Sequence, residues 1–164
     1  MKKKVAFIGL LIAFGLALSF LESLIPQVIP IPGVKLGLAN FAVLMTLYLF
    51  GFKEALIMNF ARILLASMMF GSAFSFFYAL SGALLSILIE VLLIKIDKMS
   101  EIGVSVAGGI AHNVGQILLA IIITKTIGVF YYLPFLIVSG ILAGIVIGIL
   151  VKKLRPVLKR IVKD

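Results

Sequence analysis

Long uncharged, apolar runs dominate the chain, at residues 5–21, 36–52, 63–89, 102–124 and 126–151. A helix needs about 20 consecutive apolar residues to cross a bilayer. Polar or glycine-containing breaks divide the sequence further, at residues 51–54, 71–72, 95–101 and 125–128. The pattern predicts six transmembrane helices, at residues 5–25, 34–51, 54–70, 74–96, 102–124 and 130–151.

The composition supports a membrane protein. Hydrophobic residues make up 63% of the chain and charged residues only 13%, with a mean hydropathy of +1.32. A soluble domain of this size needs more polar residues to cover its surface. We therefore expect an all-α integral membrane protein, with residues 1–164 forming one domain built as a six-helix bundle.

The basic residues predict the orientation of this bundle. If both termini are cytoplasmic, twelve of the 15 Lys and Arg residues lie inside, and only Lys35 and Lys125 lie outside. The positive-inside rule favours that topology and an even number of spans in the cell membrane. Residues 152–164 then form a basic cytoplasmic tail, and the net charge of +9 reflects topology rather than nucleic-acid binding.

Several kinds of chemistry have no motif in this sequence. There is no glycine-rich phosphate loop ending in Gly-Lys-Ser/Thr, and no paired aspartates or H-E-x-x-H motif. The chain has one histidine and no cysteine, which excludes multi-histidine and thiolate metal sites. We expect a protein without catalytic activity, metal or cofactor.

Charged or titratable residues at membrane depth are the first candidates for function, because each costs a few kcal/mol to insert. Glu22 and Lys35 lie near helix ends, where reaching the interface is an equally good explanation. Arg62 lies about 12 Å into its helix, too deep for comfortable snorkelling. The alternative for Arg62 is a structural ion pair with Glu90.

The helix predicted at residues 102–124 carries the motif Ala-His-Asn-Val-Gly-Gln. His112 and Gln116 are four residues apart and share one face, with Asn113 beside them. These side chains predict either a ligand site or a hydrogen-bonded cluster that holds helices together. Asn40 and Asn59 are weaker members of the same polar set.

Small residues recur every four positions in two helices, a spacing that lets another helix approach closely. Gly140, Gly144 and Gly148 are best explained by packing within the bundle. For Gly9, Ala13 and Ala17, a partner protein is a serious alternative.

The segments Pro-Gly-Val-Lys-Leu-Gly-Leu-Ala-Asn (residues 32–40) and Ala-His-Asn-Val-Gly-Gln (residues 111–116) resemble the S components of energy-coupling-factor (ECF) transporters. The resemblance is to the branch labelled heptaprenyl diphosphate synthase component I, or Gx transporter family, and covers nearly the whole chain. It implies a substrate-capture subunit that joins a T subunit and two ATPase subunits. It also implies that the helix-one stripe docks the T subunit, and that loops at residues 27–34, 71–73 and 125–129 close an outward-facing pocket.

The leading hypothesis is therefore the substrate-binding subunit of an ECF-type importer. Its ligand would be a small amphipathic or anionic molecule, with an isoprenoid or quinone precursor as the guess. The predicted site residues are Glu22, Lys35, Asn40, Arg62, His112, Asn113 and Gln116. The alternative is an accessory membrane subunit of a heptaprenyl diphosphate synthase, and a stand-alone carrier is less favoured without an internal repeat.

Overall fold

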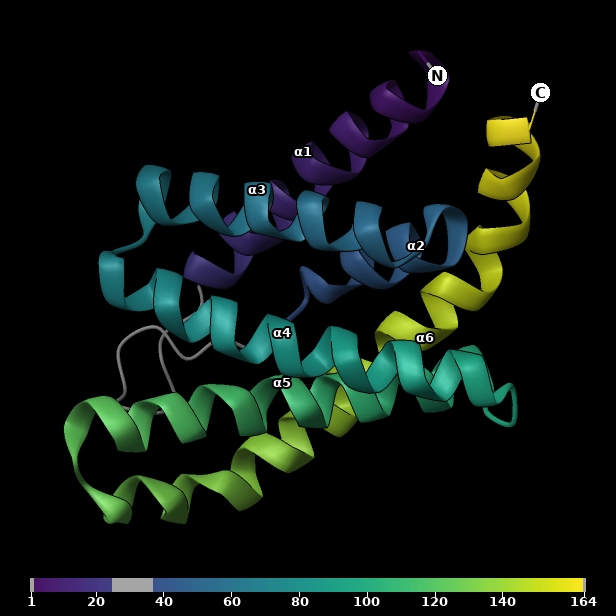
Figure 1. Cartoon of the computed structure of the whole chain (residues 1–164). Helices are drawn as coiled ribbons and strands as arrows, with labels where there is room; N and C mark the ends of the chain where they lie inside the picture. Colours follow the sequence, from purple (N-terminus) through teal and green to yellow (C-terminus); the bar gives the residue numbers. More distant parts are fainter. Residues whose placement is uncertain (1, 25–36, 164) are drawn as a thin grey trace.

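A computed structural model describes residues 2–24 and 37–163 of the chain, and this part contains α-helices and no strands (Figure 1). A short 3-10 helix, η1 (Ile127–Tyr132), precedes the last helix. The α-helices are α1 (Lys2–Leu24), α2 (Asn40–Phe50), α3 (Phe52–Phe70), α4 (Ala73–Ile96), α5 (Glu101–Thr124) and α6 (Leu133–Lys163).

Consecutive helices run in opposite directions along the bundle (Figure 1). The N-terminus of α1 and the C-terminus of α6 lie at one end, together with the α2–α3 and α4–α5 turns. The α3–α4 turn and η1 lie at the other end. This arrangement agrees with the predicted even number of crossings, because such a chain returns to its starting side.

Within the described residues, four helical segments are long and apolar enough to cross a membrane, so the chain is a multi-pass membrane protein. They are Lys3–Leu24, Ala73–Ile96, Glu101–Thr124 and Ile127–Val162. The eleven residues of α2 extend only about 16 Å, and α3 includes Lys53, Glu54 and Arg62. A count of six spans and cytoplasmic termini remain predictions.

The second helix differs from its predicted bounds, because it begins at Asn40 rather than at residue 34. Gly37 has a φ of +88°, which interrupts helical geometry. The amide N–H groups of Gly37 and Leu38 donate to the carboxylate of Glu22 instead of to backbone carbonyl groups of a preceding helical turn. The other helices begin close to their predicted starts, and α6 continues through the basic tail to Lys163.

Glycines bring α5 and α6 into backbone contact. A Cβ atom on Gly140 would lie 2.9 Å from the carbonyl oxygen of Gly109, and one on Gly144 would lie 2.6 Å from the Cα of Val106. Gly148 packs in the same way against Ile102. The predicted packing of this helix-six stripe within the bundle is thus confirmed.

The orientation can be tested with single cysteines, because the chain contains none of its own. Thr126 and Lys98 are both exposed and lie in turns at opposite ends of the bundle. We expect Thr126→Cys to react with a membrane-impermeant maleimide in whole cells, and Lys98→Cys to react only after permeabilisation. The reverse pattern would invert the topology.

Candidate functional site

A set of buried polar side chains gathers inside the bundle from four helices. Each member is at most 7% exposed. We call this set the inner polar cluster; it comprises Ser19, Glu22, Asn40, Asn59, Arg62, His112 and Gln116.

Glu22 binds the backbone just before α2. Its Oε1 atom accepts the amide N–H of Gly37 at 2.5 Å and that of Leu38 at 2.9 Å. A carboxylate that accepts amide N–H groups at the start of a helix interacts favourably with the positive end of the helix dipole. The C-terminal turn of α1 is thereby attached to the start of α2.

Gly37 is the point where three helices of the cluster meet. A Cβ atom there would lie 3.1 Å from Nδ2 of Asn40 and 3.7 Å from Cδ2 of His112. Since Glu22 binds the amide of the same residue, α1, α2 and α5 each bring one polar side chain to this glycine. Its positive φ favours glycine in addition to the limited space.

Arg62 donates hydrogen bonds to neutral side chains, and the buried carboxylate of Glu22 adds an attractive Coulombic interaction. Nη1 of Arg62 donates to the hydroxyl of Ser19 at 2.8 Å, and its Nε donates to Oδ1 of Asn59 at 3.0 Å. Nη2 also donates to the same Asn59 oxygen. Gly15 leaves room for the side chain, because a Cβ atom there would lie 2.7 Å from Cδ of Arg62.

The alternative of an ion pair between Arg62 and Glu90 is not found in the described structure. Glu90 lies at the α4–α5 contact, where its Oε1 accepts the hydroxyl of Ser86 at 3.3 Å. A Cβ atom on Gly108 would overlap this carboxyl group. Oε2 of Glu90 has no hydrogen-bond partner in the described part of the chain.

His112 and Gln116 share the face of α5 that meets α4, as their spacing predicts. A Cβ atom on Gly82 would lie 3.0 Å from both Cε1 of His112 and Cγ of Gln116. Among the described residues, Nδ1 of His112 and both amide atoms of Gln116 lack hydrogen-bond partners. Buried polar groups without partners are rare and costly, so these atoms are candidates for contact with a ligand.

Asn113 points in a different direction from its two neighbours. Its Nδ2 donates to the carbonyl oxygen of Leu136 at 2.6 Å and to the hydroxyl of Ser139 at 3.4 Å, both on α6. This geometry gives Asn113 a role in joining α5 to α6. Its Oδ1 atom is buried without a partner in the described structure.

Lys35 and the loop at residues 27–34 are outside the described residues. The predicted closing segments at residues 71–73 and 125–129 lie together at the end of the bundle opposite the termini (Figure 1).

The small-residue stripe of α1 faces outward. Gly9, Ala13 and Ala17 are all exposed, and a Cβ atom on Gly9 would meet nothing within 4 Å. The opposite face of α1, which includes Gly15 and Ser19, packs inside the bundle. The stripe is therefore not occupied by another described helix.

Sequence reasoning missed Ser19 and Gly15 as parts of the site. Gly15, Ser19 and Glu22 are spaced four and three residues apart, which places them on one face of a helix. That spacing is the feature of the sequence that could have identified Gly15 and Ser19 as neighbours of Glu22. The cluster supplies hydrogen-bonding groups, one buried cation (Arg62) and one buried carboxylate (Glu22). Across residues 2–24 and 37–163 no group of three His, Cys, Asp or Glu side chains could hold a metal ion.

A protein-family model described as heptaprenyl diphosphate synthase component I matches residues 11–154. No curated protein and no solved structure shows significant similarity to the chain.

Proposed function

The chain belongs to the heptaprenyl diphosphate synthase component I family, and from this premise we propose that it is a non-catalytic membrane subunit that binds a small molecule. The observation that carries the proposal is the amide of Gln116, which is fully buried and unpaired at both atoms within the described structure. A ligand with one donor and one acceptor would satisfy it. Nδ1 of His112 offers a further contact on the same face.

The cluster suits a small ligand with a polar or anionic group on an apolar body. Arg62 uses three of its five N–H groups on Ser19 and Asn59, so donors remain for an anionic oxygen. In a low-dielectric site a cation gains far more from a ligand anion than it would in water. From the sequence alone, we include Lys35, two residues before Gly37, as a second cation of the proposed site. An isoprenoid or quinone precursor fits this description.

We further propose that the chain is the substrate-binding subunit of an ECF-type importer in the cell membrane. The exposed stripe of Gly9, Ala13 and Ala17 supports this assignment, because its small side chains leave room for a helix of a T subunit. Two ATPase subunits would supply the nucleotide hydrolysis for which this chain has no phosphate loop.

The second candidate is an accessory membrane subunit of a heptaprenyl diphosphate synthase. The description of the matching family favours it, since it names a component of such an enzyme. In that case the α1 stripe would bind the catalytic component. The inner polar cluster would then bind a membrane-derived substrate or product.

Co-expression distinguishes the two candidates. We expect the tagged chain to copurify with a T subunit and two ATPases, and to do so without a prenyl synthase component. Ala13→Trp and Ala17→Trp should abolish this copurification, because an indole ring prevents close helix approach. Leu142→Trp is the control, since Leu142 is 61% exposed on α6 and lies outside the stripe.

One outcome would count against the importer, and another only against the α1 stripe as its docking surface. Copurification with the synthase component, lost in the same variants, would favour the second candidate. Unchanged assembly in both α1 variants would show that the stripe is not a docking surface.

A further inference from the structure

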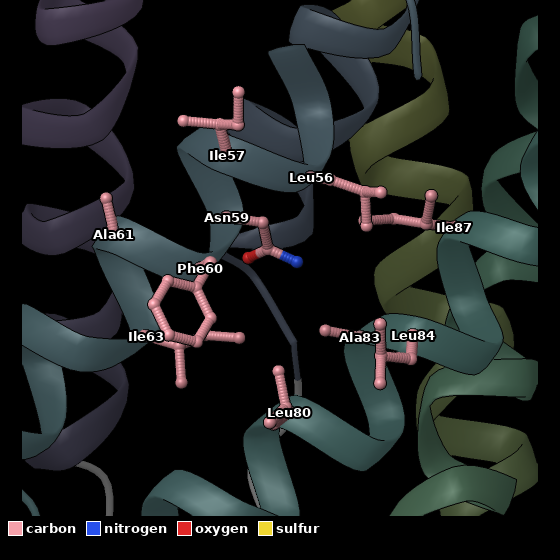
Figure 2. Close-up of a pocket in the computed structure, with 10 residues that line it drawn as sticks. All are labelled: Leu56, Ile57, Asn59, Phe60, Ala61, Ile63, Leu80, Ala83, Leu84 and Ile87. Carbon is pink, nitrogen blue, oxygen red and sulfur yellow. The ribbon is translucent and has the colours of Figure 1, made fainter. Parts of the chain in front are cut away.

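A cavity of about 400 Å³ lies between α3 and α4 (Figure 2). By helical spacing its lining residues on α4 lie on the side of that helix opposite Gly82, which packs against His112 and Gln116. This volume falls in the range of small-molecule sites, about 300–1,000 Å³. Nine of its ten lining residues are apolar and the tenth is Asn59. The lining is Leu56, Ile57, Asn59, Phe60, Ala61, Ile63, Leu80, Ala83, Leu84 and Ile87.

The cavity has a buried wall and an exposed rim. Ala83 and Ile87 form part of the wall and are 2% and 1% exposed. Ile57, Phe60 and Leu84 form the rim and are 68%, 50% and 46% exposed. Because α4 is long and apolar enough to span the bilayer, this rim faces the hydrocarbon of the membrane rather than water.

Asn59 places one polar group on this apolar surface. Its Oδ1 accepts two hydrogen bonds from Arg62 and so belongs to the inner polar cluster. Its amide nitrogen points the other way, toward the α4 side of the cavity (Figure 2). The hydrogen bonds of the Asn59 side chain in the described structure use Oδ1 alone, and hydrocarbon offers no acceptor for Nδ2.

We propose that this cavity binds the hydrocarbon chain of a neutral lipid whose oxygen atom, a hydroxyl or carbonyl, accepts a hydrogen bond from Nδ2 of Asn59. The apolar lining favours a hydrocarbon chain, and the single donor, Nδ2 of Asn59, favours an oxygen acceptor. The ligand is neutral because no charged residue lines the cavity. It enters laterally from the bilayer, and the cavity shares only Asn59 with the inner polar cluster of the proposed function.

The test uses a long-chain alcohol that carries a mid-chain diazirine, added to the purified protein in lipid nanodiscs. After irradiation, mass spectrometry locates the labelled residues. We expect labels to concentrate on Ile57, Phe60 and Leu84, and an excess of unlabelled alcohol to remove them. Even labelling of all lipid-facing helices, without competition, would show only contact with bulk lipid and would overturn the proposal.

A matched pair of variants tests the volume of the cavity. Ala83→Phe fills the wall and should reduce labelling to the level found elsewhere on the surface. Leu88→Phe adds an aromatic ring to the same helix at a position that is 53% exposed and does not line the cavity. It should leave the labelling unchanged. Equal labelling in the folded Ala83 variant and the wild type would contradict the proposal.

Asn59→Asp tests the hydrogen bond without removing the acceptor for Arg62. It retains Oδ1 but loses the amide donor, and the new charge is paired with the guanidinium. We expect affinity for a long-chain ketone, which can only accept a hydrogen bond, to fall about five-fold, as for one lost hydrogen bond, while an alkane probe of equal length binds as before. An unchanged preference for the ketone over the alkane would show that Asn59 does not bind the oxygen. If Ala83→Phe fails to fold, the Asn59→Asp variant and the competition experiment on the wild-type protein still test the proposal.

Discussion

Gln116→Leu is expected to make the protein more stable while abolishing ligand binding. The wild-type amide is fully buried and has no partner at either atom among the described residues. Leaving such a group unsatisfied costs about 1–3 kcal/mol, and leucine has a similar volume without polar atoms. The variant should therefore gain stability of that order in the absence of ligand.

The same substitution removes the donor and the acceptor that we assign to the ligand. Small molecules that copurify with the wild type in mild detergent, detected by mass spectrometry, should be missing from the variant. Thermal unfolding of the ligand-free proteins measures the stability. The ligand must be removed first, because a bound ligand stabilises the wild type by mass action.

Asn113→Leu is the matched control on the same helix. Its Nδ2 is bonded to the carbonyl oxygen of Leu136 on α6, so the same chemical change should destabilise the fold by about 1 kcal/mol or more. If Gln116→Leu also destabilised the ligand-free protein, its amide would have a structural partner. The central observation behind the proposed function would then be lost.

The helices could be predicted because membrane spans depend on local sequence. The number of apolar residues and the polar breaks place α3, α4 and α5 almost where the structure has them. The start of α2 could not be placed in this way. It depends on Glu22, whose carboxylate binds the amide of Gly37, fifteen residues later in the chain. Such a contact between helices leaves no trace in local hydropathy.

In the candidate site, too, the features set by local sequence could be predicted and those set by distant contacts could not. The four-residue spacing of His112 and Gln116 correctly places both on one face of α5, because helical periodicity determines it. The partners of Arg62 were not predictable from its depth, since Ser19 is 43 residues away in sequence. Likewise, the orientation of Asn113 toward α6 depends on a backbone carbonyl that no sequence pattern marks.

Gly144→Leu is expected to have the largest effect on folding. A Cβ atom at this position would lie 2.6 Å from the Cα of Val106 and 2.9 Å from the carbonyl oxygen of Ser105. Both neighbours are backbone atoms, so no side chain can rotate to make room. The helices α5 and α6 would have to separate, which would also weaken the hydrogen bond from Asn113 to Leu136.

We expect this substitution to cost about 3 kcal/mol or more, the upper end for overpacked cores. The measurement is the midpoint of thermal unfolding in detergent, together with the fraction that elutes as a monodisperse species. Gly9→Leu is the matched control, because a Cβ atom at Gly9 would meet nothing within 4 Å. It should fold like the wild type. Equal stability of the two variants would mean that α5 and α6 do not pack through their glycines, and the position of His112 and Gln116 relative to the rest of the cluster would need revision.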